Sequence, residues 1–234
     1  MTEELSFEAY LSISQKKFGI YLLDKKNLKN IYKEELQIEN DLDIINYNLL
    51  SRFLDSNIFK IEKLTGEFLK NITIIIDNHQ ILNSSICIKK KIYENNTDKQ
   101  YLQTVLTELK DLFKENYQNN KIIHIIVNRY SIDDVNYNLF NEKIDGDLMC
   151  MEVSFISAPN ILTKEVGNVM KKYQIKIDRF LDGKYIANFF EEDSQDLSIN
   201  AFKINNGQNQ NEIDLVPKSL KKNGFFEKFF QLFS

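Results

Sequence analysis

Hydrophobic and polar residues alternate along some parts of the chain, as in strands, and recur at spacings of three and four in others, as in helices. The places where one pattern gives way to the other mark the boundaries of the predicted strands and helices. Three short β-branched or aromatic runs with polar breaks predict strands near the start. They lie at 7–13, 18–24 and 30–39. Apolar residues then recur at spacings of three and four from Ile45 to Leu64, which predicts an amphipathic helix. We expect Asp43 to cap its start and Gly66 to end it.

The middle of the chain alternates between strands and helices. Apolar or alternating runs predict strands at 71–78, 82–94, 121–133, 145–157 and 176–183. Helical spacing predicts a helix over 97–116, capped by Thr97 or Asp98, and another from Pro159 to Ile175. Gly183 is expected to stop the last strand. Beyond about residue 187 the chain is polar and rich in Asn and Gln. We therefore expect a flexible linker over most of 191–217, with a short strand near 198–204 as the only regular element.

Residues 218–234, KSLKKNGFFEKFFQLFS, carry a different pattern. Five phenylalanines at spacings of one, three, one and three fall on one face of a helix, with lysines on the other side. These features fit a helix lying in a membrane interface. The expected contact residues are Leu220, Lys221, Lys222, Phe225, Phe226, Lys228, Phe229, Phe230, Leu232 and Phe233. A tail that docks onto its own domain or onto a partner protein is the alternative.

The expected free energy of membrane binding by this tail bears on whether the protein acts as a single copy or as several. Partial burial of the phenylalanine rings is worth on the order of 5 kcal/mol in total, the scale of one myristoyl chain. A single copy would therefore bind weakly, and several copies held together would bind by avidity. The tail predicts self-association or a polymeric partner.

Composition narrows the function classes. A hydrophobic content of 43% supports a buried core, and a net charge of -4 argues against a nucleic-acid partner. No GxxxxGK[ST], GxGxxG or GxSxG motif is present, so no glycine-rich phosphate cradle is expected. The opening MTEELSFEAY has no apolar signal segment, and no run reaches ~18 apolar residues. We expect a cytoplasmic chain without a membrane span.

Few residues could carry chemistry. Cys87 and Cys150 are the only cysteines, and two cannot form a structural zinc site alone. His79 and His124 are the only histidines, and in apolar runs both are interpreted as satisfied core residues. Cys150 is interpreted as a strand residue rather than a reactive thiol. We therefore expect no catalytic residue, no cofactor-binding residue, no metal ligand and no enzymatic activity.

The order of elements resembles the bacterial cell-division protein FtsA, an actin-like membrane tether. The most similar stretches are KIIHIIVNRYSIDD (121–134), residues 145–183 and FLKNITIIIDNHQILNSSICI (68–88). The resemblance implies an α+β fold with a partial actin-like (RNase H-like) subdomain and an inserted SHS2-type subdomain, called 1A and 1C in that family. The implied parts are 1A at 1–68 and 159–190, 1C at 69–158, a flexible linker at 191–217 and a C-terminal amphipathic helix at 218–234.

This sequence departs from the family at its phosphate loops. The first hairpin reads SISQKK (12–17), without glycine or an acidic residue, and Gly19 comes too late to replace one. The second loop, of D-x-G-G-x-T type, is missing. Backbone cradles for phosphate need glycine, so we expect no ATP binding and no cofactor. The family's FtsZ site lies in the missing half, and FtsZ tethering is not carried over.

The resemblance implies a non-catalytic cell-division adaptor, peripheral at the cytoplasmic side of the inner membrane and concentrated at midcell. Its implied partners are anionic inner-membrane lipids, other FtsA-like subunits and late division proteins, and not nucleic acid. The runner-up is a pilus-assembly-type actin-like scaffold that binds the cytoplasmic tail of a membrane protein, a group that normally lacks the terminal helix. Two more alternatives remain: an actin-like ATP-binding protein with an unusual site, and an unrelated α+β protein whose C-terminal helix binds a protein groove.

Overall fold

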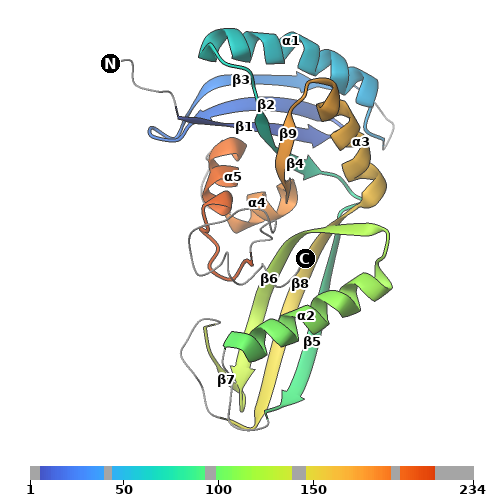
Figure 1. Ribbon diagram of the computed structural model, residues 1–234, viewed down its shortest axis with the longest axis vertical. Coiled ribbons are helices and arrows are strands. Elements are labelled where there is room, and N and C mark those ends of the chain that lie inside the picture. Colours follow the sequence, from blue (N-terminus) through green and yellow to red (C-terminus); the bar gives the residue numbers. More distant parts are fainter. Residues whose placement is uncertain (1–5, 40–43, 93–98, 139–145, 191–195, 214–234) are drawn as a thin grey trace. The chain divides into compact units, whose positions relative to one another are not determined.

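The computed structural model describes residues 6–39, 44–92, 99–138, 146–190 and 196–213 (Figure 1). These residues form two compact units. The first unit comprises the described parts of Met1–Ile81 and Pro159–Gln208, and the second comprises those of Leu82–Ala158 and the segment from Asn209 onward. Each unit is a sheet with its own helices and core, so the chain has a mixed α+β fold.

The first unit is built on a five-stranded sheet with the order β3-β2-β1-β4-β9. Its strands are β1 (Phe7–Ser14), β2 (Lys17–Asp24), β3 (Lys29–Gln37), β4 (Asn71–Asp77) and β9 (Lys176–Asp182). The first three strands form an antiparallel meander, whereas β4 runs parallel to β1 and β9 runs parallel to β4. The three parallel strands therefore present their carboxyl ends at one edge of the unit.

Helices cover both faces of this sheet. α1 (Tyr47–Thr65) and α3 (Asn160–Lys172) lie on one face, and α4 (Gly183–Phe189) and α5 (Leu197–Asn205) lie on the other (Figure 1). The Phe18 and Phe53 rings meet at 6.2 Å on the first face. On the second face, Ile186 of α4 and Ala201 and Ile204 of α5 pack on the sheet. Because both faces are covered, β1, β2 and β4 are buried almost continuously.

The ends of α1 follow ordinary capping rules. Asn46 is its N-cap, and its side chain accepts a hydrogen bond from the Leu49 N–H at 3.0 Å. The expected cap, Asp43, lies outside the described residues. Gly66 ends the helix with a φ of 74°, so the prediction for that residue is confirmed.

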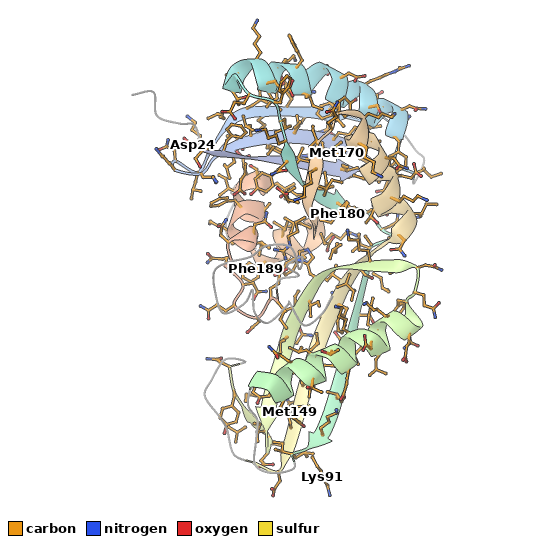
Figure 2. All side chains as sticks on the ribbon, in the orientation of Figure 1. Asp24, Lys91, Met149, Met170, Phe180 and Phe189 are labelled. Carbon is orange, nitrogen blue, oxygen red and sulfur yellow. The ribbon has the colours of Figure 1, made fainter. Side chains whose placement is uncertain are left out.

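The second unit is a four-stranded sheet with one helix, in the order β5-β8-β6-β7. Its elements are β5 (Leu82–Lys91), α2 (Lys99–Asn116), β6 (Asn120–Ile132), β7 (Val135–Asn136) and β8 (Leu148–Pro159). α2 covers one face, where the Phe113 and Phe155 rings stack at 5.0 Å. Met149 belongs to the same core and is labelled in Figure 2. The expected capping residues of this helix, Thr97 and Asp98, lie outside the described residues.

A short segment near residue 212 adds to the edge of the second sheet. The Val127 N–H donates to the Asn211 carbonyl at 2.9 Å, and the Ile213 N–H donates to the Ile125 carbonyl at 2.8 Å. Ile213 is buried in the core beneath α2. The chain thus passes from α5 of the first unit to an edge position in the second unit.

The prediction of a linker over 191–217 is wrong for its described part, 196–213. α5 occupies Leu197–Asn205, which also excludes the expected strand near 198–204. Its inward positions include polar residues, because Ser198 is buried and its hydroxyl donates to Asn30 Oδ1 at 2.8 Å. Buried Ser and Asn side chains interrupt the apolar period, which explains why the sequence pattern shows no helix.

Two expected boundaries also differ. The inserted part begins at Leu82 rather than at 69, because β4 pairs with β1 and β9 in the first sheet. The expected end at 158 coincides with the division after Ala158. Gly183 does not simply stop a strand: it starts α4 directly, with Asp182 as the N-cap.

Candidate functional site

Ligands of open sheets with parallel strands bind beyond the carboxyl ends of those strands. In the first unit, β1 ends at Ser14, β4 at Asp77 and β9 at Asp182. Ser14 pairs with Asp77, and Asp182 pairs with the residue before Asp77, so the three ends lie in neighbouring register. We call Ser14, Asp77 and Asp182 the strand-end site. Ser14 belongs to the first hairpin, SISQKK (12–17), which lacks the glycine of a phosphate loop.

The turn between β1 and β2 uses its own groups for its hydrogen bonds. The Ser14 hydroxyl lies 2.9 Å from the Lys17 nitrogen, whose N–H it accepts, and 3.0 Å from the Lys17 carbonyl. The Gln15 side-chain nitrogen lies 2.7 Å from His79 Nδ1. The turn therefore directs one of its N–H groups at its own serine, whereas a phosphate cradle would leave it free for a ligand.

Gly19 serves the packing of the sheet. A Cβ at this position would come within 2.5 Å of the Tyr21 hydroxyl oxygen. That hydroxyl donates to Glu35 Oε1 at 2.5 Å, which lowers the pKa of Glu35, while burial raises the pKa of Tyr21. The glycine makes room for this hydrogen bond, which explains its presence in a strand without any phosphate.

The start of α4 is occupied by a carboxylate. Asp182 Oδ2 accepts the Tyr185 N–H at 3.0 Å, and Asp182 is buried. A Cβ on Gly183 would lie 3.2 Å from the Asp77 Cβ, so the glycine lets α4 begin close to the end of β4. An incoming phosphate would meet two carboxylates, which disfavours an anion at this point. At the strand-end site, Ser14 and Asp182 thus make hydrogen bonds to backbone groups of the chain itself.

A second candidate surface is the face of the second sheet opposite α2. β5 alternates between half-buried and exposed residues, and Ile86 and Ile88 point to the core under α2. The residues in between share the opposite face with side chains of β8 and β6, and we call this set the open face. It consists of Ser85, Cys87, Asn128, Cys150, Glu152 and Ser154.

Hydrogen bonds link the open face across three strands. The Ser85 and Ser154 hydroxyl oxygens are 2.7 Å apart, and Asn128 Nδ2 donates to the Ser154 hydroxyl at 2.7 Å. The Cys87 and Cys150 sulfurs are 3.5 Å apart. A polar, partly exposed sheet face of this kind can meet polar groups of a partner. The alternating pattern of 82–94 predicts a half-exposed strand, but it does not reveal which strand lies beside it.

The two histidines have different environments. His124 is fully buried, and its Nδ1 lies 2.6 Å from Glu212 Oε1, so its interpretation as a satisfied core residue is confirmed. The same interpretation is wrong for His79, which is exposed because it follows the end of β4 rather than lying within the strand. Glu212 is the partner that sequence reasoning missed, since it lies 88 positions further along the chain.

The sequence-predicted membrane residues lie outside the described residues. They are Leu220, Lys221, Lys222, Phe225, Phe226, Lys228, Phe229, Phe230, Leu232 and Phe233. Within the described ranges, no helix is both long and apolar enough to span a membrane. The same ranges contain no group of three or more His, Cys, Asp or Glu side chains arranged to hold a metal ion.

Comparison with known proteins gives likenesses of fold only. No family model matches this chain, and no curated protein matches it. The chain is similar to the cytoplasmic domain of EpsL, an inner membrane component of the type II secretion system of Vibrio cholerae. Their identity is 10%, the match covers 77% of this chain and 59% of that one, and the TM-score is 0.40.

Two more solved structures are similar at the same level. For the PilM–PilN type IV pilus biogenesis complex the identity is 7%, the coverage is 79% of this chain and 50% of that one, and the TM-score is 0.48. A Bacteroides thetaiotaomicron protein of unknown function, described as having an actin-like ATPase fold, is 13% identical. The match covers 80% of this chain and 57% of that one, and the TM-score is 0.33. The chain thus spans between 50% and 59% of the length of these chains, and none of the three descriptions mentions cell division.

Proposed function

We propose that this chain is a non-catalytic, actin-like scaffold that works at the cytoplasmic face of a membrane and binds the cytoplasmic segment of a membrane protein. The observation that carries the proposal is the set of internal hydrogen bonds and carboxylates at the strand-end site. Asp182 caps α4 beside Asp77, and Ser14 accepts an N–H of its own turn. A sheet whose ligand edge is occupied in this way supports binding to proteins rather than turnover of a nucleotide.

The order and direction of the strands in the first sheet support the actin-like part of the proposal. An antiparallel meander of three strands is followed by two parallel strands, and a separate unit is inserted between β4 and α3. This arrangement supports the proposal of a partial actin-like subdomain with an inserted subdomain. The polar open face of the second unit supplies a surface for a partner.

The membrane part of the proposal rests on the pattern of residues 218–234. EpsL is described as an inner membrane component and PilM–PilN as a pilus biogenesis complex. With TM-scores of 0.40 and 0.48, these names carry no argument for this chain.

Flotation of the full chain with phosphatidylglycerol vesicles tests the membrane part. Phe230→Glu places a charge on the apolar side of the tail, and Gln231→Glu places the same charge on its polar side. We expect loss of vesicle binding in the first variant and retention in the second, with little binding to phosphatidylcholine vesicles. Equal binding by both variants would contradict the proposal.

In-cell photo-crosslinking tests the partner. A benzophenone amino acid replaces Lys89, an exposed residue of β5, with replacement of the exposed Lys26 in the first unit as the control. The proposal expects an adduct at residue 89 that maps to the cytoplasmic segment of a membrane protein. Adducts with soluble proteins alone would contradict it.

An FtsA-like division adaptor is the second candidate, favoured by the amphipathic pattern of 218–234, which pilus-assembly relatives normally lack. It differs from the first candidate in its position and its partners. A fluorescent fusion of the full chain would form a midcell band, and residues 1–216 would be diffuse. A uniform membrane signal would exclude the division role and leave the first candidate in place.

A further inference from the structure

The only two cysteines of the chain meet on the open face of the second sheet. They are 63 positions apart in the sequence, and their sulfurs are 3.5 Å apart. Cys87 lies on β5 opposite Glu152, and Cys150 lies on β8 opposite Lys89, so the two thiols are diagonal neighbours across one strand pair. They share a face because the alternate residues of β5 and β8 pack into the core beneath α2.

The two thiols differ in their access to solvent. Cys87 is exposed, whereas Cys150 is buried with 7% of its surface accessible. A dissolved oxidant can therefore reach Cys87 directly. Cys150 lies next to the Cys87 sulfur, so it is placed to react with whatever forms there. The pair has the arrangement of an attacking thiol and a resolving thiol.

We propose that Cys87 and Cys150 form a modification site at which a low-molecular-weight disulfide of the glutathione class converts the pair into an intramolecular disulfide. The Cys87 thiolate attacks the small disulfide, which gives a mixed disulfide and releases one small thiol. The Cys150 thiolate then attacks the Cys87 sulfur, which gives the Cys87–Cys150 bond and releases the second small thiol. The two cysteines lose two electrons and two protons, and the small disulfide gains both.

The second step requires the two sulfurs to move closer together. A disulfide bond is about 2.05 Å long, so the sulfurs must approach by about 1.5 Å from their separation of 3.5 Å. The continuous pairing of β5 with β8 holds the two strands in register, together with the hydrogen bond between Ser154 and Ser85, two residues before Cys87.

The surroundings of the Cys87 thiol affect the rate of the first step. Burial, the Cys150 thiol and the Glu152 carboxylate raise the pKa of Cys87, and Lys89 lowers it. The raised pKa keeps most of Cys87 protonated near neutral pH, so the reaction is slow there and becomes faster as pH rises. Glu152→Gln removes one of the groups that raise the pKa, and the increase in rate then shifts to lower pH.

Mass spectrometry of the full reduced chain tests the site. The protein is incubated at low micromolar concentration with oxidised glutathione, unfolded in urea so that the buried Cys150 is accessible, treated with iodoacetamide and measured intact, then digested without reductant. We expect a loss of about 2 Da, no alkylation of either thiol, and a linked peptide pair that contains Cys87 and Cys150. Reduced glutathione should restore two alkylatable thiols.

Single variants separate the roles of the two thiols. Cys150→Ser should accumulate the mixed glutathione disulfide on Cys87, and Cys87→Ser should gain no glutathione because Cys150 is buried. Three results would overturn the proposal in the wild-type chain: two thiols that stay alkylatable, a mixed disulfide that never resolves, or disulfide-linked dimers. An equal rate–pH profile for Glu152→Gln would refute the electrostatic part. The chemistry does not depend on the proposed function, so either can fail alone.

Discussion

The two sheets of this protein differ in the number of faces that helices cover. β4 reads NITIIID, with every interior residue buried, and helices lie on both faces of its sheet. β5 reads LNSSICIKKK, with alternate residues exposed, because α2 covers one face only. The first sheet is therefore covered on both faces, whereas the second has a face with hydroxyls and thiols that no described helix covers. Of the two sheets, the second is the one that we expect to meet partners and small reagents.

The largest loss of stability is expected from substitutions on the two faces of β4. Ile74 and Ile75 are adjacent and fully buried, and they point to opposite faces of the sheet. We expect Ile74→Ala and Ile75→Ala each to reduce the free energy of unfolding by about 2–5 kcal/mol, because each leaves a cavity. Urea unfolding followed by circular dichroism measures both. A cost well under 1 kcal/mol at either position would mean that one face is not packed.

The next largest loss of stability is expected at the segment near residue 212, which pairs with β6 at the edge of the second sheet. Glu212 Oε1 lies 2.6 Å from Nδ1 of the buried His124, next to the backbone pairing of Ile213 with Ile125. We expect Glu212→Ala to reduce the free energy of unfolding by about 1–3 kcal/mol, since it removes a partner of a buried polar group. Hydrogen exchange of the Ile213 N–H should rise in the same variant. Unchanged exchange would show that backbone pairing alone holds the segment.

On the open face, the effect should be small. Ser85→Ala removes one hydrogen bond to Ser154, but Asn128 still donates to the Ser154 hydroxyl. We expect a loss of about 1 kcal/mol or less, against a larger loss for Ile86→Ala on the covered face of the same strand. If the two variants cost the same in urea unfolding, the contrast between the two faces of β5 would be wrong.

The smallest effect concerns pH. Lys33 Nζ lies 2.7 Å from Asp196 Oδ1 at the start of α5, and this hydrogen bond lowers the pKa of Asp196. A lowered carboxyl pKa contributes stability above the unfolded value of about 3.9, and this contribution is lost as pH falls through the folded value. The pair is exposed, so we expect less than about 1 kcal/mol. Asp196→Asn should flatten the acid side of the stability–pH curve, and an unchanged curve would show that the pair contributes nothing.

Elements with strong periods could be predicted from the sequence. The strands of the meander, the helix ended by Gly66 and the helix after Pro159 all have clear apolar spacing and local stop or start signals. α5 could not be predicted, because Ser198 and Asn200 are buried on its inner side and break the apolar stripe. The spacing of apolar residues in the sequence predicts which hydrophobic side chains are buried. It does not predict the burial of polar side chains whose hydrogen-bond partners lie far away in the sequence.

The candidate sites were less accessible to sequence reasoning. The missing glycines predict that SISQKK forms no phosphate cradle, and the Ser14 hydrogen bonds within this turn support that prediction without testing it. The cap by Asp182 and the meeting of Cys87 with Cys150 depend on strand order and register. Neither is encoded in spacing along the chain, so both appear only once the sheets are assembled.

The central claim is that the strand ends of the first sheet are closed to phosphate. Calorimetric titration of MgATP into the full chain tests it most directly, with Asp182→Asn as a variant that removes the capping charge. We expect no saturable heat at millimolar nucleotide for the wild-type chain. Saturable binding with a micromolar dissociation constant would contradict the claim and restore an actin-like nucleotide-binding function.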